Sequence, residues 1–441
     1  MAYKIGMVSL GCPKNQIDAE AILKRLSDAG FELTPYEAEA DVIIVNTCGF
    51  IEEAKREAID NILDVCRYKQ EGKLKAIVVT GCLAERYSQE VLDEIPEVDA
   101  VVGIGKNGDI VQIINRVLSG ERLCALDEKT RLDINSPRIL TTPFYTAYLK
   151  IAEGCDNCCT YCAIPMIRGR FRSRKIEAVI DEAKQLAASG VKEIVLVAQD
   201  TTRYGEDIYN CKKLPELLDE LCKIEGLEWI RMLYTYPDRI TDELLDTMAK
   251  QKKVVNYLDI PIQHCNRNIL KRMNRTGDER ELLILLKKIR ARLSDVAIRT
   301  TLITGFPGEG EAEFEQLCEF VREAKFDRLG CFAYSEEEGT IAAQLEPRVD
   351  MQVRIDRAET VMNDQYTVVT EKNRAKIGTI RQVLVEGYDK YVKMYFGRTS
   401  HDAPDIDGKV FFKSSCPLQA GEFAQVKIND ILEYDLLGER V

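Results

Sequence analysis

The sequence predicts an α/β fold in three parts: an N-terminal parallel α/β domain, a central partial barrel of the TIM type, and a small C-terminal antiparallel β-barrel. Apolar runs alternate with helical patterns through most of the 441 residues, which is typical of parallel sheets with helices on their faces. From Lys376 the helical periodicity stops and short alternating runs begin. We expect domains at 1–135, 141–372 and 375–441.

The composition is that of a globular protein, with 45% hydrophobic and 30% charged residues. No apolar run is long enough to cross a bilayer, and the N-terminal residues lack the apolar stretch of a secretory signal. We therefore expect a cytoplasmic protein without a membrane partner. Thiols stay reduced there, so the fifteen cysteines indicate metal or redox chemistry rather than disulfides.

Three apolar runs in the N-terminal part each end at a cysteine, and each is short enough to be a buried strand. These are 4–11 before Cys12, 41–47 before Cys48, and 75–81 before Cys82. Helical patterns such as 18–29 and 51–68 lie between them. The carboxyl ends of parallel strands share one edge of a sheet, so the three thiols should converge. This placement favours an iron–sulfur cluster, although each cysteine alone could simply fill a tight turn.

A glycine-rich segment at 103–108 reads Gly-Ile-Gly-Lys-Asn-Gly, follows a strand-like pair and precedes a helical pattern. A dinucleotide site has this spacing, and Asp127 lies at a suitable distance downstream. Asp109 at the helix start would, however, repel a pyrophosphate at the positive end of the helix dipole. We therefore expect a glycine-rich turn here.

The central part begins with a strand-like run at 146–151, followed by a C-x3-C-x2-C motif formed by Cys155, Cys159 and Cys162. Three thiolates bind three irons of a four-iron cluster and leave one iron open, whereas electron-transfer clusters are closed by a fourth cysteine. A zinc site is the alternative, but zinc sites usually add a second cysteine pair or histidines. The spacing, with Tyr161 inside it, resembles the defining motif of the radical S-adenosylmethionine (SAM) enzymes.

Five more strand-like runs follow, separated by helical patterns such as 177–189 and 280–294. The runs are 193–198, 229–234, 257–260, 297–303 and 328–333. Six such units predict an open or partial barrel with its site at the carboxyl ends of the strands. Gln199 and Asp200 lie at one such end, where we expect them to contact SAM. Capping of the next helix is the alternative for both.

Two other features of the central part have open or structural interpretations. A dense basic stretch after the cysteine motif is either a solvated face or a site for an acidic group of SAM or of the substrate. It contains Arg168, Arg170, Arg172, Arg174 and Lys175. His264, one of two histidines in the chain, is expected to be a hydrogen-bonded structural residue.

The C-terminal runs at 379–385, 391–396, 409–412 and 421–428 predict a small barrel of about five strands. Residues 374–441 contain ten basic and ten acidic side chains, whereas a grip on RNA usually needs a basic face. The net charge of -12 also disfavours binding to phosphate backbones and suits a basic partner. We expect that nucleic acid is not required.

Across its length the chain resembles the radical SAM methylthiotransferases, with three N-terminal cysteines, a C-x3-C-x2-C domain and a barrel of the TRAM type. The segment 9–15, Ser-Leu-Gly-Cys-Pro-Lys-Asn, is similar to the RimO branch, whereas the tRNA-modifying branch typically has Gln-Met-Asn after this cysteine. Other segments similar to that branch are 199–205, 257–264, 334–340 and 402–408. Cys158 and the Ile-Arg-Gly-Arg at 167–170 depart slightly from the pattern but leave the expected ligands intact.

The resemblance implies two [4Fe-4S] clusters, one held by Cys155, Cys159 and Cys162 and an auxiliary one held by Cys12, Cys48 and Cys82. It implies that SAM is cleaved by one electron, from a donor such as a flavodoxin or ferredoxin. We expect Tyr161 to bind SAM together with Gln199 and Asp200. The implied reaction is methylthiolation of the β-carbon of an aspartate in the twelfth small-subunit ribosomal protein, with no catalytic residues beyond the cluster ligands. A tRNA adenosine (C2) methylthiotransferase and a non-catalytic iron–sulfur RNA-binding protein remain as alternatives.

Overall fold

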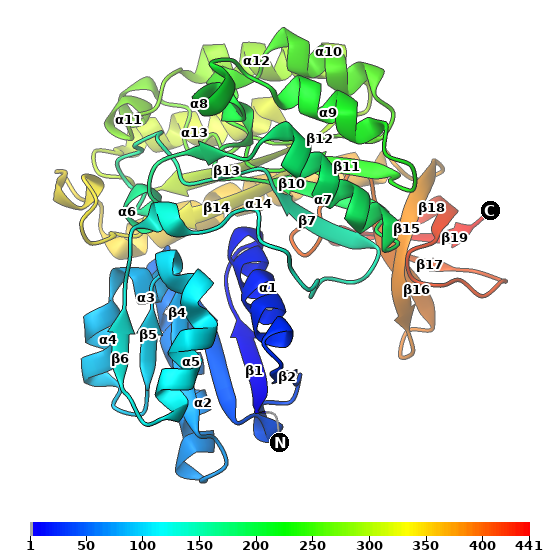
Figure 1. The fold of residues 1–441 in the computed structure, drawn as a ribbon. Coiled ribbons are helices and arrows are strands. Elements are labelled where there is room, and N and C mark those ends of the chain that lie inside the picture. Colours follow the sequence, from blue (N-terminus) through cyan, green and yellow to red (C-terminus); the bar gives the residue numbers. More distant parts are fainter. Residues whose placement is uncertain (1–2) are drawn as a thin grey trace.

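The computed structural model describes residues 3–441 (Figure 1). Residues 1 and 2, the first positions of the expected N-terminal domain, lie outside the described residues. The chain forms two six-stranded parallel sheets and a closed five-stranded barrel, so the predicted three-part architecture is confirmed. Figure 1 shows the N-terminal sheet standing below the central barrel, with the C-terminal barrel to the right.

The N-terminal sheet has the order β2-β1-β3-β4-β5-β6. Its strands are β1 (Lys4–Ser9), β2 (Glu32–Leu33), β3 (Val42–Thr47), β4 (Ala76–Gly81), β5 (Ala100–Val102) and β6 (Leu123–Ala125). Every residue of β3 and β4 is buried, which explains why these runs are apolar throughout rather than alternating. The sequence pattern found β1, β3 and β4, whereas the very short β2 and β6 gave no periodic signal.

Helices cover both faces of this sheet. One face packs against α1 (Pro13–Asp28) and α5 (Ile110–Leu118). The other packs against α2 (Glu52–Gln70), α3 (Cys82–Arg86) and α4 (Ser88–Glu94). The glycine-rich segment at 103–108 lies in the short 3-10 helix η2 (Ile104–Asp109), where Lys106 Nζ lies 2.8 Å from Asp109 Oδ2 and 3.0 Å from Asp127 Oδ2. Asp127, the carboxylate that a dinucleotide site would use, is therefore paired within the domain.

The central sheet has the order β14-β13-β12-β11-β10-β7 and is parallel at every pairing. Its strands are β7 (Thr146–Lys150), β10 (Glu193–Val197), β11 (Trp229–Met232), β12 (Val254–Asp259), β13 (Ala297–Thr304) and β14 (Arg328–Ala333). The longer helices between and after them are α7 (Ile176–Ala188), α9 (Leu214–Cys222), α10 (Asp242–Lys250), α12 (Glu279–Arg292), α13 (Glu311–Ala324) and α14 (Met351–Arg374). Because β7 and β14 are end strands, the barrel is open, as predicted.

The C-terminal barrel closes in the order β15-β16-β17-β19-β18. Its strands are β15 (Ile380–Asp389), β16 (Met394–Thr399), β17 (Val410–Lys413), β18 (Phe423–Leu432) and β19 (Asp435–Arg440). One feature corrects the prediction of an antiparallel barrel, since β17 and β19 pair in parallel. Successive strands joined by short loops pair antiparallel, and the parallel pairing closes the barrel between strands that are not consecutive.

Buried ion pairs join this small barrel to the amino ends of the central strands. Glu193, the first residue of β10, accepts hydrogen bonds from Arg231 Nε at 2.9 Å and Arg398 Nη2 at 2.6 Å, and all three side chains are at most 1% exposed. The Tyr257 hydroxyl donates to Asp407 Oδ2 at 2.6 Å. The C-terminal barrel is therefore anchored at the end of the central barrel opposite the carboxyl edge.

Replacing Glu193 with Gln should destabilise the protein, because two buried guanidinium groups would lose their shared counter-charge. We expect the free energy of unfolding to fall by about 3 kcal/mol, measured by chemical denaturation. Glu319→Gln, at an exposed position, is the matched control. Equal stability of the two variants would contradict the anchoring role.

Candidate functional site

The first set of thiols lies at the carboxyl edge of the N-terminal sheet. Cys12 is the residue before α1, Cys48 follows β3, and Cys82 is the first residue of α3 after β4. Strands β1, β3 and β4 are neighbours in the sheet, so the three cysteines leave adjacent strands at the same edge. This is the arrangement that the sequence predicted.

Two glycines allow the cysteine loops to approach closely. Gly11 has φ +88°, and a Cβ there would lie 2.8 Å from Cys48 Cβ and 3.1 Å from its Sγ. Gly81 has φ +94°, and a Cβ there would lie 2.4 Å from the Thr47 carbonyl oxygen. Both positions therefore require glycine for conformation and for space. The Asn15 amide ties the same loops together by donating to the carbonyls of Leu10 and Thr47.

The pKa values of these thiols show that they influence one another. Burial, together with the neighbouring thiols of Cys82 and Cys12, raises the pKa of Cys48 to about 11. Burial also raises the pKa of Cys82, against the opposing effect of Arg168. For Cys12 the effect of burial is outweighed by the cations Lys14 and Arg168, so that its pKa is lowered. Thiolates bind metal, so a bound metal centre would supply the charge that stabilises the ionised forms.

The second set of thiols lies in the loop between β8 (Ala152–Glu153) and α6 (Ile164–Arg168). Burial raises the pKa of Cys155 to about 11, and that of Cys162 is raised by burial and then by Cys159 and Cys155. The loop is fixed from outside, since Thr160 N donates to the Met273 carbonyl at 3.1 Å. Three thiols are thus gathered at the carboxyl edge of the central barrel, after its first strand.

A buried arginine organises the side chains around Cys159. Arg275 Nη1 lies 3.9 Å from Cys159 Sγ and donates to the Tyr161 hydroxyl at 3.4 Å, while Nη2 donates to the Pro261 carbonyl at 2.6 Å. Its guanidinium also lies 4.2 Å from the centroid of the Tyr236 ring. Tyr161, which lies within the thiol loop, is thereby held by the guanidinium of Arg275 and by an edge-to-face contact with Phe306.

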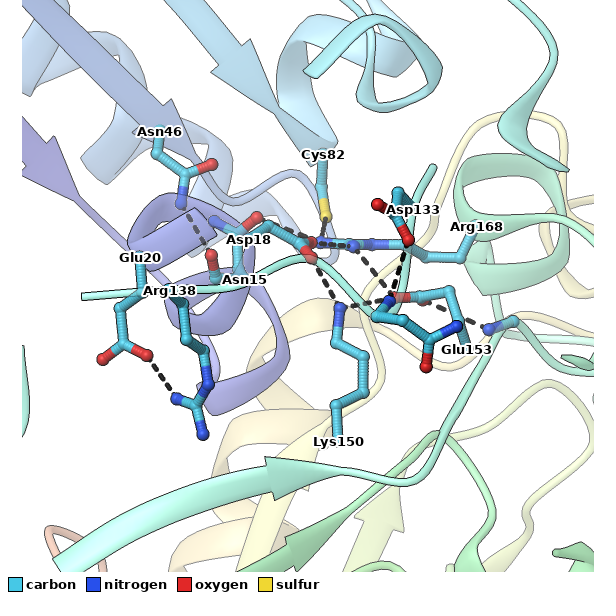
Figure 2. Close-up of polar contacts among 12 residues, drawn as sticks. Asn15, Asp18, Glu20, Asn46, Cys82, Asp133, Arg138, Lys150, Glu153 and Arg168 are labelled. Atoms are coloured by element: carbon cyan, nitrogen blue, oxygen red, sulfur yellow. Dashed lines mark hydrogen bonds and ion pairs between the residues drawn. The ribbon is translucent and has the colours of Figure 1, made fainter. Parts of the chain in front are cut away.

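A buried polar network crosses the junction between the N-terminal and central domains and reaches Cys82 of the first set of thiols (Figure 2). Arg168, at the end of α6, donates from Nη2 to Cys82 Sγ at 3.3 Å and to Asn15 Oδ1 at 3.0 Å. Its Nη1 pairs with Asp18 of α1 and lies 3.5 Å from Glu153 Oε2. Arg168 therefore belongs to the central domain but contacts a cysteine of the N-terminal domain.

Lys150 completes this network from β7. Its Nζ donates to Asp18 Oδ1 at 2.5 Å and to Glu153 Oε2 at 2.7 Å, and its side chain is 2% exposed. Glu153 Oε1 accepts from Gln199 Nε2 at 2.8 Å. Within residues 3–441, Gln199 Oε1 is buried and has no hydrogen-bond partner. A series of polar contacts thus connects Cys82 with Gln199 and ends at the unpaired Oε1 atom of Gln199.

Over the described residues, no group of three or more Cys, His, Asp or Glu side chains is arranged to hold a single metal ion. An iron–sulfur cluster makes a different demand, because each thiolate binds its own iron. The donors fit such a group, with three thiols at each site and a buried acceptor beside one of them. All fifteen cysteines are free thiols.

Family models match three successive parts of the chain. Residues 4–103 match the uncharacterized protein family UPF0004, residues 149–321 match the radical SAM superfamily, and residues 377–441 match the TRAM domain.

Relatives match over the whole length. The chain is 51% identical to the ribosomal protein uS12 methylthiotransferase RimO of Pelotomaculum thermopropionicum, covering 100% of both chains. It is 49% identical to the protein of the same name from Clostridioides difficile, covering 99% of this chain and 98% of the other. The chain belongs to the RimO family. It is a radical SAM methylthiotransferase, and this family uses SAM and a [4Fe-4S] cluster.

Solved structures support the fold of this RimO-family chain. The radical SAM methyltransferase TsrM from Kitasatospora setae superposes with a TM-score of 0.59 at 14% identity, covering 78% of this chain and 77% of TsrM. The cobalamin-dependent enzyme OxsB superposes with a TM-score of 0.51 at 14% identity, covering 83% of this chain and 58% of OxsB.

Gln199 and Asp200, two of the three residues predicted to bind SAM, have different surroundings in the structure. Asp200 Oδ1 accepts from Thr202 N at 3.1 Å, which is the helix-capping role weighed as its alternative, and Oδ2 accepts from Asn157 Nδ2 of the cysteine loop at 2.8 Å. Gln199 keeps its open acceptor. The SAM-binding roles of Tyr161, Gln199 and Asp200 stay predictions.

The side chains of the basic stretch after the cysteine motif have different surroundings in the structure. Arg170 is exposed beside Asp156, and Arg174 is buried and donates to Glu182. Only Arg168 reaches a thiol. His264 is fully buried, where Nδ1 accepts from Asn266 N at 2.9 Å and Nε2 faces Glu309 at 3.4 Å, as expected of a structural residue.

Sequence reasoning missed the specific contacts of Arg168 and Arg275 with cysteines, and it assigned no role to Lys14. Arg168 was visible only as one member of a basic stretch, because its partner is 86 residues away in the chain. Arg275 follows a helix and carries no motif of its own. Lys14 lies two residues after Cys12, and in the sequence only its place in the 9–15 motif distinguishes it.

None of the helices within residues 3–441 combines the length and hydropathy needed to cross a bilayer.

Proposed function

We propose that this protein methylthiolates the β-carbon of an aspartate in the ribosomal protein uS12, using two [4Fe-4S] clusters and SAM. The observation that supports this most is that Cys82 of the N-terminal thiol triad (Cys12, Cys48 and Cys82) reaches the central domain, where it accepts from Arg168 and packs against Ala163, the residue after Cys162 of the second triad (Cys155, Cys159 and Cys162). Two centres that share one junction can act on the same substrate carbon. The net charge of -12 suits a basic ribosomal protein.

In this proposal Cys155, Cys159 and Cys162 hold the SAM-binding cluster, and a one-electron carrier such as a flavodoxin or ferredoxin supplies the electron. Cys12, Cys48 and Cys82 hold the auxiliary cluster. When bound, these groups supply the one-electron chemistry that converts an unactivated C–H bond into a C–S bond whose sulfur carries a methyl group. We place the reaction in the cytoplasm, where ribosomal proteins are made.

In this proposal the chain's own side chains bind SAM, orient the residues of the two cluster sites, and exclude water from the junction. The Gln199 Oε1 atom offers a buried acceptor to the ammonium group of SAM. Arg275 holds the Tyr161 ring next to the thiol loop. Arg168 donates to Cys82 from within the network of Asp18 and Glu153, which ties a thiol of the N-terminal triad to the central domain. Such positioning accounts for much of what a protein adds to cofactor chemistry.

Replacing Cys12, Cys48 and Cys82 together with Ala should halve the iron content. Anaerobically reconstituted wild-type protein should carry about eight irons per chain and the triple variant about four, as measured by iron and sulfide analysis. Cys124→Ala, which removes an exposed cysteine outside both triads, is the control. An unchanged iron content in the triple variant would refute the auxiliary cluster.

The substrate is tested by offering uS12 and a tRNA anticodon stem-loop to the reduced enzyme with SAM. We expect a methylthio mass increase on uS12 and release of 5′-deoxyadenosine, detected by mass spectrometry and chromatography. Both should be lost in Cys159→Ala. Modification of the RNA alone would overturn the choice of substrate, and absence of SAM cleavage would favour a non-catalytic protein.

A further inference from the structure

The junction holds a buried cation that is not balanced by a carboxylate. Lys14 is 7% exposed, and within the described part of the chain no carboxylate oxygen lies within 4.0 Å of its Nζ. The ammonium instead lies 3.3 Å from the centroid of the Tyr234 ring. An ammonium over an aromatic ring is stabilised but not neutralised.

The neighbouring cations differ from Lys14 in this respect. Lys150 and Arg168 share the two carboxylates Asp18 and Glu153, so these four side chains balance one another. Lys14 therefore contributes one positive charge in excess of the carboxylates of this network. A buried charge without a counter-charge is costly, so a site that retains one is expected to receive an anion.

The position of Lys14 places this excess charge between the two domains. Lys14 lies in the first turn of α1, two residues after Cys12, and its ammonium reaches Tyr234, which follows β11 at the carboxyl edge of the central barrel. Tyr234 has φ +61°, an unusual conformation for a tyrosine, and its N–H donates to Asp259 Oδ2 at 2.9 Å. Such strained residues often occur at ligand sites.

The thiols are one candidate for the anion, because Lys14 lowers the pKa of Cys12, but within residues 3–441 Lys14 makes no hydrogen bond to a cysteine sulfur. The cation that donates to a cysteine sulfur at this junction is Arg168, at 3.3 Å from Cys82 Sγ. The Lys14 ammonium is directed onto the Tyr234 ring in the facing domain. It is thus placed to meet an anionic group that enters between the domains.

Building on the proposed function, we infer that Lys14 binds the side-chain carboxylate of the target aspartate and so determines specificity for it. The reacting β-carbon of aspartate is bonded directly to the carboxylate carbon. If that β-carbon lies between the two triads, its carboxylate must lie in the same junction. A desolvated ammonium there pairs with a carboxylate and is left unpaired by a neutral amide, which gives discrimination.

The test is a binding measurement that does not depend on turnover. Anaerobically reconstituted wild-type enzyme and its Lys14→Met variant are each titrated with uS12 and with uS12 whose target aspartate is replaced by asparagine. Wild type should prefer the aspartate form by about tenfold or more, and Lys14→Met should bind both forms alike. Lys73→Met, which changes an exposed lysine of the same domain, should keep the wild-type preference.

Iron content and the electron paramagnetic resonance (EPR) spectra of both clusters are recorded for each variant. A preference for aspartate that persists in Lys14→Met overturns the inference. So does a loss of preference that coincides with loss or alteration of the auxiliary cluster, since Lys14 would then serve the cluster. If the wild-type enzyme modifies uS12 in the turnover assay, the proposed function stands even when one of these two results overturns the role of Lys14. If the wild-type enzyme does not modify uS12, both the proposed function and the role of Lys14 are wrong.

Discussion

The architecture of the site depends on the buried guanidinium of Arg168. It is 1% exposed and contacts Asn15, Asp18 and Cys82 of one domain and Glu153 of the other. A buried ion network of this kind is weak evidence for stability, because desolvation offsets much of the attraction. Its geometry is nevertheless demanding, since each charge needs its partners in place. We interpret it as the element that fixes the relative orientation of the two domains.

A second buried network acts at the other end of the central barrel. Glu193 joins two arginines, one from β11 and one from the C-terminal barrel. The carboxyl edge of the barrel thus faces the N-terminal domain, and the amino edge is closed by the small barrel. The carboxyl edge of the central sheet thus carries the cysteine loop, and the amino edge binds the C-terminal barrel.

The sequence predicted much of the fold and the convergence of the cysteines, for identifiable physical reasons. Strands β3 and β4 are buried on both faces, so they appear as continuous apolar runs ending at Cys48 and Cys82. Parallel pairing then brings those ends together without further information. The parallel pairing of β17 with β19 could not be predicted, because it depends on how the barrel closes rather than on any local pattern.

The charged residues of the junction were beyond sequence reasoning for a related reason. Whether an arginine is solvated or buried against a thiol depends on contacts between distant segments, and Arg168 meets Asp18 across 150 positions. Lys14 likewise has an ordinary local context. It becomes unusual only in the fold, where no carboxylate oxygen of residues 3–441 lies within 4.0 Å of its Nζ.

The central claim is that both metal centres face one junction closely enough to act on a single carbon. EPR of the anaerobically reduced, doubly reconstituted protein tests this most directly, with the triple variant that lacks the auxiliary thiols as the single-cluster reference. We expect magnetic coupling between the clusters, visible as broadened or split signals and fast relaxation that the reference lacks. Two independent signals that simply add would place the centres too far apart and contradict the account.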